Sequence, residues 1–175
     1  IHDETVGLIA FGHISREMAK RCQVLGMKVL AYDPFVSAEA GAEAGVEMVS
    51  LQELAQRSDY VSCHLPLGPK TRGMIDASFF QHMKPSAYFI NTSRGAVVKE
   101  ADLIAALQEG RIAGAGLDVF ESEPLAPGHP FLSMDNVTLT PHSASYADST
   151  MAMQRWRIGK DARAVCEGGL PDFVA

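Results

Sequence analysis

The stretch Thr5–Asp33 reads TVGLIAFGHISREMAKRCQVLGMKVLAYD, and this stretch decides the fold. It opens with the apolar run Val6–Ala10, which is short enough to be a strand buried on both faces. A tight turn at residues 11–13 follows, after which apolar residues recur every three or four positions and predict an amphipathic helix. These helix positions are Ile14, Met18, Cys22 and Leu25, with Gly26 at the end. A second apolar run, Val29–Tyr32, leads to Asp33, so the stretch predicts a βαβ unit that binds a mononucleotide.

The residue types of this unit suit a pyrophosphate. A helix N-terminus has unpaired N–H groups and a partial positive charge, and Gly12 leaves room for an anion to approach them. Asp33 lies 21 residues after Gly12, the usual distance for an acid that hydrogen-bonds a ribose 2′-hydroxyl. A carboxylate there repels a 2′-phosphate, and Pro34 follows it instead of an arginine. The predicted cofactor is therefore NAD and not NADP.

The glycine pattern of the turn is incomplete. The usual G-x-G-x-x-G reads AFGHIS, so Ala10 and Ser15 replace two glycines and Gly12 alone remains. Because Ala10 and Ser15 are small, we expect the tight turn and the helix–strand contact to survive with a slight adjustment. Taken alone the motif is weak, since any βαβ unit with a glycine turn would show it.

Composition indicates one globular domain, residues 1–175, of which 47% are hydrophobic and 21% charged. The net charge of −6 argues against a nucleic-acid surface. No apolar run approaches the length of a membrane span, and the N-terminus lacks a basic-then-apolar signal pattern. We interpret Cys22, Cys63 and Cys166 as reduced core thiols of a cytoplasmic protein, and we expect neither a disulfide nor a metal. The chain begins at Ile1, almost directly on the first strand, which we interpret as a fragment or an engineered piece.

Strands and helices alternate along the rest of the chain with short connections, and no repeat or linker is evident before Gly168. The predicted strands are 46–49, 60–64, 87–91, 113–119 and 136–140, and the predicted helices are 37–44, 50–57, 76–83, 99–108 and 145–167. Ser50 and Glu53 form a capping box, and Ser145 or Asp148 is expected near the cap of the last helix. This alternation predicts an α/β fold with a doubly wound parallel sheet.

In such a sheet, ligands bind at the carboxyl ends of the strands. The residues at those ends are able to carry chemistry, and they are Gly12, Asp33, His64, Asn91–Arg94, Asp118, Glu123 and His142. Their gathering at one predicted edge is a better signal than any single motif.

Arg94 and His142 are the side chains best suited to act on a small acid. An arginine after a buried strand offers a planar fork that binds a carboxylate with two hydrogen bonds; the alternative is a pair with a surface acid. His142 follows Pro141, which stiffens its turn, and an imidazole can take or give a proton at a hydroxyl or carbonyl oxygen. Either Glu121 or Glu123 could orient that imidazole and favour one tautomer. His2, His13, His82 and His129 are interpreted as bystanders by default.

A guanidinium for a carboxylate, an imidazole for a proton and a nicotinamide alongside suit hydride transfer at a 2-hydroxy or 2-keto acid. At this point the chain resembles the NAD-binding, Rossmann-type domain of the D-isomer-specific 2-hydroxyacid dehydrogenases, relatives of phosphoglycerate dehydrogenase and glyoxylate/hydroxypyruvate reductase. The resemblance rests on TVGLIAFGHI, LGMKVLAYDP, HLPLGPKTRGMI, MKPSAYFINTSRGAVV, IAGAGLDVFESEPL and NVTLTPHSAS, which cover nearly all of the chain in the right order.

The resemblance implies a role for each matching residue. Arg94 is similar to the carboxylate-binding arginine, His142 to the acid/base, and Glu123 (more than Glu121) to the partner of that histidine. The residues similar to those that line the cofactor are Gly12, His13, Ile14, Asp33, Leu65, Pro66, Thr71, Thr92, Ser93, Arg94, Asp118 and His142. It further implies an NAD-dependent oxidoreductase for D-2-hydroxy or 2-keto acids that works as a cytoplasmic homodimer, with no nucleic-acid or membrane partner.

Departures from the family pattern leave an alternative open. His13 stands where an arginine is common, and His142 is followed by SAS where the dehydrogenases often have a glycine pair. That variant is similar to a subgroup including C-terminal-binding-protein corepressors, so an NAD(H)-sensing interaction module is the alternative. The family also has a substrate-binding domain, built mainly from residues before this stretch, that this chain lacks. We therefore expect the chain alone to be inactive.

Overall fold

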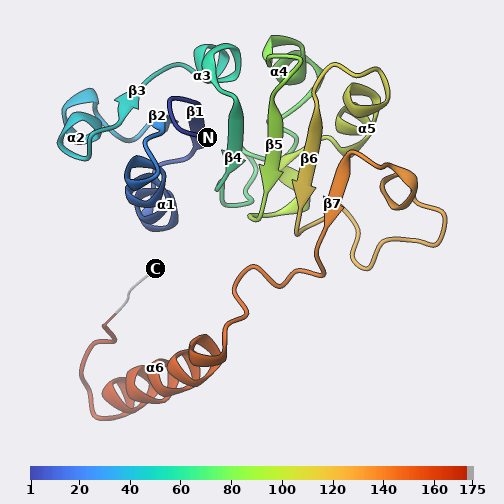
Figure 1. The fold of residues 1–175 in the computed structure, drawn as a ribbon. Coiled ribbons are helices and arrows are strands. Elements are labelled where there is room, and N and C mark those ends of the chain that lie inside the picture. The colour runs from blue at the N-terminus through green and yellow to red at the C-terminus, as the bar shows by residue number, and fades with distance from the viewer. Residues whose placement is uncertain (173–175) are drawn as a thin grey trace. The chain divides into compact units, whose positions relative to one another are not determined.

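The computed structural model describes residues 1–172, and its centre is a seven-stranded parallel sheet (Figure 1). The strand order is β3-β2-β1-β4-β5-β6-β7, and every neighbouring pair is parallel. The strands are β1 Thr5–Ile9, β2 Lys28–Tyr32, β3 Glu47–Met48, β4 Tyr60–Cys63, β5 Tyr88–Asn91, β6 Gly114–Leu117 and β7 Val137–Leu139. The order reverses between β1 and β4, which is the switch point where dinucleotides bind in such sheets. The predicted doubly wound parallel sheet is confirmed.

Within residues 1–172, five helices lie between the strands near their predicted places, and a sixth follows the last strand. They are α1 His13–Val24, α2 Ala38–Glu43, α3 Leu51–Arg57, α4 Ala77–His82, α5 Glu100–Gln108 and α6 Asp148–Cys166, with short 3₁₀ turns η1 Gly95–Val97 and η2 Pro130–Ser133. The chain forms two compact units, Ile1–Pro141 with the sheet and a second unit that begins at His142 and contains α6. All the predicted site residues except His142 lie in the first unit.

Side chains alternate along β1 between two hydrophobic clusters, one on each face of the sheet. Val6 and Leu8 belong to the cluster that also contains residues of α1 and β2, whereas Ile9 belongs to the larger cluster around α3, α4 and α5. Gly7 faces α3 so closely that a Cβ would lie 2.3 Å from the Ser58 Oγ. Helices therefore pack on both faces, and the strand ends are left to carry the site.

The buried face of α1 differs from the predicted one. Ser15, Ala19 and Cys22 are buried, whereas the Ile14 side chain is 72% exposed and the Leu25 side chain 53% exposed. Small residues face the sheet because α1 packs closely against it, and apolar spacing alone favoured the larger residues. The prediction that Ile14, Met18 and Leu25 form the core-facing stripe is therefore wrong, and Cys22 alone of the four is buried.

The predictions for the C-terminal helix also need correction. The helix starts at Asp148 and not at residue 145, so Asp148 lies next to the cap residue Ala147 as expected, although no side chain caps the helix. None of its residues is buried. Cys166 is consequently exposed and not a core thiol, while Cys22 and Cys63 are buried as predicted.

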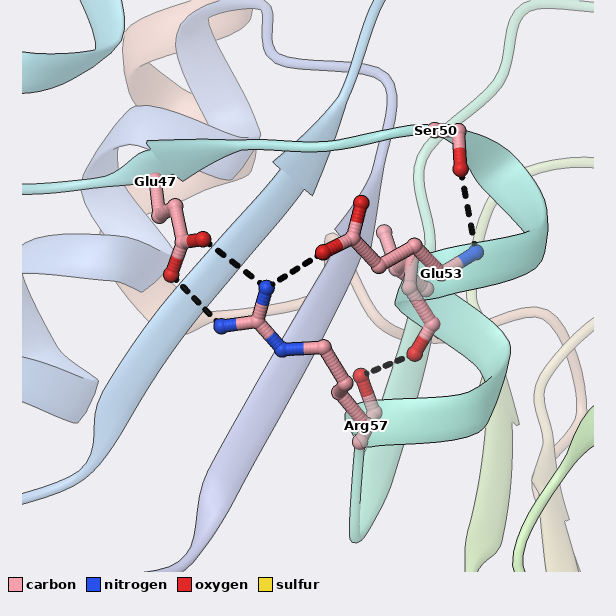
Figure 2. Close-up of polar contacts among 6 residues, drawn as sticks. Glu47, Ser50, Glu53 and Arg57 are labelled. Carbon is pink, nitrogen blue, oxygen red and sulfur yellow. Dashed lines mark hydrogen bonds and ion pairs between the residues drawn. The ribbon is translucent and has the colours of Figure 1, made fainter.

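The predicted capping box at α3 forms in one direction (Figure 2). Ser50 Oγ accepts from the Glu53 N–H at 3.2 Å, which satisfies one of the free donors of the helix start. The Glu53 carboxylate accepts from Arg57 Nη1 at 2.7 Å. Arg57 also bonds both carboxylate oxygens of Glu47 in β3, at 2.8 and 2.6 Å. An exposed charge network thus links α3 to the edge strand.

Candidate functional site

The turn between β1 and α1 is shaped to accept an anion. Ala10 has φ of 71°, which is a left-handed conformation. The first glycine of the G-x-G-x-x-G motif usually occupies this position, because glycine adopts such a conformation without strain. Gly12 caps α1, no side-chain hydrogen bond caps that helix start, and no acid lies in its first turn. A Cβ on Gly12 would meet nothing within 4 Å among the described residues, so the approach to the N–H groups is open.

Asp33 lies beside this turn, as predicted. Its Oδ2 accepts from the Phe11 N–H at 2.9 Å, and its Oδ1 accepts from the Phe35 N–H at 2.9 Å. The side chain is half-buried at the end of β2, and the two bonds fix its carboxylate next to the first residues after β1. His13 and Ile14 begin α1 and are both exposed.

Ser15 fills the position of the third glycine at a cost. It is fully buried, and within the described part of the chain its Oγ has no hydrogen-bond partner. Burying an unpaired hydroxyl is unfavourable. The close helix–strand contact is therefore kept, but the serine is accommodated without a bond for its hydroxyl.

The segment after β4 adjoins β1, across the switch point. Leu65 is buried and Pro66 is exposed. The Thr71 hydroxyl donates to the Pro66 carbonyl oxygen at 2.6 Å and accepts from the Gly68 N–H at 2.9 Å, which closes the loop on itself. His64 Nε2 lies 3.0 Å from Ser62 Oγ, and burial lowers the pKa of the imidazole.

Asn91, at the end of β5, holds the loop that carries Thr92, Ser93 and Arg94. Its side chain is 1% exposed. Oδ1 accepts from the Ser93 N–H at 3.0 Å and from Ser93 Oγ at 2.8 Å, and Nδ2 donates to the Arg94 carbonyl oxygen at 3.1 Å. Arg94 itself is exposed, and its Nη1 donates to the Ser93 carbonyl oxygen at 2.6 Å. The sequence predicts that Asn91 lies at the end of a strand. Its polar side chain after a buried strand was the one indication that it supports the loop.

The loops after β5 and β6 touch each other. A Cβ on Gly95 would lie 1.9 Å from the Phe120 carbonyl carbon and oxygen, so only glycine allows this approach. The Phe120 N–H donates to Glu123 Oε1 at 3.0 Å, which ties the glutamate to its own loop. The structure thus brings the Arg94 loop and the Glu123 loop into contact.

Asp118 is nearly fully buried between these loops and β7. Its N–H donates to the Asn91 carbonyl oxygen at 3.0 Å, and its Oδ1 accepts from Thr140 Oγ1 at 2.5 Å. His142 has φ of 52° and is the first residue of the second unit. Its predicted convergence with Arg94 and Glu123 therefore stays a prediction.

Residues 1–172 contain no group of three or more His, Cys, Asp or Glu side chains arranged to hold a metal ion. In the same part of the chain, none of the helices combines the length and apolar character that crossing a bilayer requires.

An all-parallel sheet, an anion-accepting glycine turn at its switch point and an acid beside that turn define a dinucleotide-binding domain of the Rossmann type. Residues 1–144 match the family described as D-isomer specific 2-hydroxyacid dehydrogenase, NAD binding domain, and the chain belongs to this family.

Relatives and solved structures agree with this assignment. The chain is 40% identical to the glyoxylate reductase of Korarchaeum cryptofilum over 171 residues, 98% of this chain and 52% of that protein. It is 43% identical to the D-3-phosphoglycerate dehydrogenase of Archaeoglobus fulgidus over 145 residues, 83% of this chain and 28% of that protein. The NAD-complexed D-isomer specific 2-hydroxyacid dehydrogenase of Lactobacillus delbrueckii ssp. bulgaricus superposes with a TM-score of 0.87 at 36% identity, covering 97% of this chain and 55% of that chain. The chain thus spans about half or less of the length of these relatives.

NAD fits the residues present. The open space at Gly12, the uncapped start of α1 and the fixed Asp33 carboxylate are the features that a pyrophosphate and a ribose require. The cofactor of this domain is NAD, as the sequence predicted.

Proposed function

We propose that the whole protein containing this chain is an NAD-dependent oxidoreductase that interconverts D-2-hydroxy acids and 2-keto acids. The observation that carries the proposal is the contact between the Arg94 and Glu123 loops, at the same strand ends as the dinucleotide turn. Bound NADH would supply the hydride in the reductive direction. The remaining chemistry falls to side chains of this chain.

Each side chain has a defined task in this proposal. The planar guanidinium of Arg94 binds and orients the substrate carboxylate. His142 donates a proton to the carbonyl oxygen in reduction and takes it back in oxidation. Glu123 accepts from the far ring nitrogen of His142 and so fixes its tautomer.

The cofactor has a proposed set of contacts. Gly12, His13 and Ile14 are assigned to the pyrophosphate, Asp33 to the adenosine ribose and Asp118 to the nicotinamide end. The bordering residues are Leu65, Pro66, Thr71, Thr92 and Ser93, and Arg94 and His142 are assigned to the same set.

His142→Gln in the whole protein tests the proposal. We expect kcat to fall by about 10²- to 10⁴-fold, since a general acid contributes that much, while the Kd for NADH stays unchanged. His82→Gln, a histidine on α4 that bonds the Ser78 carbonyl oxygen, is the matched control and should keep parent kcat. Equal turnover in His142→Gln and the parent would remove His142 from the mechanism.

Short 2-keto acids are the proposed substrates. The name of the Korarchaeum relative, glyoxylate reductase, favours glyoxylate as the first compound to try. The screen follows NADH consumption by the whole protein with glyoxylate, hydroxypyruvate, pyruvate and longer keto acids. The chain alone should show no turnover.

The altered turn favours one second candidate, a module that senses NAD(H) and binds a partner. Ala10 in a left-handed conformation and the unpaired Ser15 hydroxyl are departures that a regulatory site could tolerate. Tight NADH binding without turnover of any keto acid in the screen would favour the sensor. Turnover lost in His142→Gln would favour the enzyme.

We also propose a cytoplasmic homodimer. The buried thiols of Cys22 and Cys63 suit a reducing compartment. Exposed apolar side chains of the first unit, Val24 and Phe35 among them, would be covered in a dimer. Sedimentation of the whole protein decides the oligomeric state.

A further inference from the structure

The loop that carries Glu123 donates a hydrogen bond to a second glutamate, Glu100, which no sequence motif indicated. Glu100 is the first residue of α5, and its two carboxylate oxygens have different partners. Oε1 lies 3.0 Å from His129 Nε2, and Oε2 accepts from the Glu121 N–H at 3.1 Å. The Glu100 and His129 side chains are only 19% and 16% exposed, so water competes weakly for these bonds.

The second ring nitrogen of His129 fixes how the pair is built. Nδ1 accepts from the Phe131 N–H at 3.3 Å, so Nε2 bears the proton and donates it to Glu100. The ring also packs on Phe131, with centroids 5.0 Å apart. Phe131 in turn packs near Phe120, at 6.5 Å between centroids. The imidazole therefore joins α5 to the far end of the segment that begins at Phe120.

The bond from Glu100 reaches the loop at the point that matters for the site. Glu100 accepts a hydrogen bond from the Glu121 N–H. The preceding residue is Phe120, and its carbonyl group packs against Gly95 of the Arg94 loop. The N–H of Phe120 is also the donor to Glu123 Oε1. A shift of this main chain would therefore displace Glu123 and loosen the packing beside Arg94.

We infer that Glu100 and His129 form a positioning pair that holds the Phe120–Glu123 loop in register with the Arg94 loop. The inference rests on the proposed function. Neither residue is assigned a contact with substrate or cofactor, so the pair acts through Glu123 and Arg94. Losing it should lower kcat by about tenfold or more, because small displacements of reacting groups are costly. The Kd for NADH should change much less than kcat, because the turn at Gly12 is held by other residues.

The test compares three variants with a matched control in the whole protein. E100A removes both acceptors. E100Q keeps one carbonyl oxygen and should recover part of kcat. H129N retains an acceptor for the Phe131 N–H but lacks the reach of the imidazole to Glu100. E109Q, which changes an exposed glutamate at the other end of α5, should match the parent.

Two readouts are taken for every variant: kcat and KM for the keto acid, and hydrogen exchange of the segment 118–124. We expect E100A to exchange at least about tenfold faster in that segment, with E100Q and H129N between it and the parent. If E100A does not fold, E100Q and H129N carry the comparison against E109Q.

The inference would be overturned if segment 118–124 of E100A exchanged hydrogen at the same rate as in the parent protein. Faster exchange in E100A with an unchanged kcat would also overturn it. Failure of the proposed function has a different signature, namely a parent protein that turns over no keto acid. In that case the exchange data still decide whether the pair anchors the loop, while its catalytic purpose is overturned together with the proposed function.

Discussion

The dinucleotide turn and the loops after β5 and β6 are held in different ways. At the turn, the main chain sets the shape: Ala10 adopts a left-handed conformation, and one carboxylate, Asp33, receives the Phe11 N–H. At the loops, side chains set the shape: Asn91 and Glu100 together accept or donate five hydrogen bonds from neighbouring loop groups.

The difference shows what each part of the site can tolerate. A pyrophosphate is bound by N–H groups, so glycines can be replaced by alanine or serine as long as the backbone path is kept. A carboxylate and a proton need particular side chains in fixed places, so Arg94 and Glu123 require supports of their own. Variants at the two regions should therefore affect different quantities.

Asn91→Ala should have the largest effect on stability. It leaves the Ser93 N–H and the Arg94 carbonyl oxygen without their buried partner and opens a small void, which we expect to lower the free energy of unfolding by about 3 kcal/mol. In the whole protein, kcat/KM for the keto acid should fall further than the affinity for NADH.

Urea denaturation measures the stability term, and Ser93→Ala is the comparison variant. Ser93→Ala removes the bond between Ser93 Oγ and Asn91 and keeps the main-chain bonds, so its cost should be about 1 kcal/mol. Equal losses in the two variants would contradict the view that Asn91 organises the loop through its main-chain partners.

The sequence predicted the fold well because the signals that define it are local. The change from strand to helix period, and the polar residue at each strand end, are visible within short windows. Parallel pairing then places all carboxyl ends at one edge, which is why the loops of Arg94 and Glu123 could be expected near each other. The ends of the helices and strands differ from the predicted ends by one or a few residues, and β3 contains only Glu47–Met48 of the predicted strand 46–49.

The supports of the site could not be predicted in the same way. Asn91, Glu100 and His129 bond to main-chain groups of loops or to each other across 29 residues, and nothing local in the sequence encodes a loop path. As a lone histidine, His129 has the pattern of a bystander, whereas in the structure it contacts Glu100 and the Phe131 N–H. Apolar spacing does not predict the buried face of α1, because close packing against the sheet selects Ser15 and Ala19 over larger residues.

Asp33→Asn should have the next largest effect, on cofactor affinity. The amide keeps the side-chain shape but loses one acceptor oxygen and the charge, so the Kd for NADH should rise by about tenfold. The preference for NADH over NADPH should narrow, because the repulsion of a 2′-phosphate is removed. Fluorescence titration with both cofactors measures this, and an unchanged ratio of the two Kd values would contradict the assignment of Asp33 to the ribose.

Ala10→Gly should stabilise the protein by about 1 kcal/mol, because alanine is disfavoured at φ of 71° and glycine is not. Ala42→Gly, at an exposed position within α2, should have the opposite sign at similar size, since glycine weakens a helix. Thermal unfolding compares the two. A loss of stability in Ala10→Gly would mean that the turn does not store the strain that its dihedral angle indicates.

Arg57→Met should have the smallest effect, and it separates the number of hydrogen bonds from their burial. Arg57 donates three hydrogen bonds to Glu47 and Glu53 at 2.6 to 2.8 Å, as many as the Asn91 side chain makes (Figure 2). Its side chain, however, is 40% exposed and its partners 56% and 45%, and exposed ion pairs contribute little because water and salt screen them. We expect a loss of about 0.5 kcal/mol in urea denaturation, less still at high salt, with unchanged NADH affinity and kcat. A loss as large as that of Asn91→Ala would mean that bond number, rather than burial, decides how firmly a segment of this sheet is held.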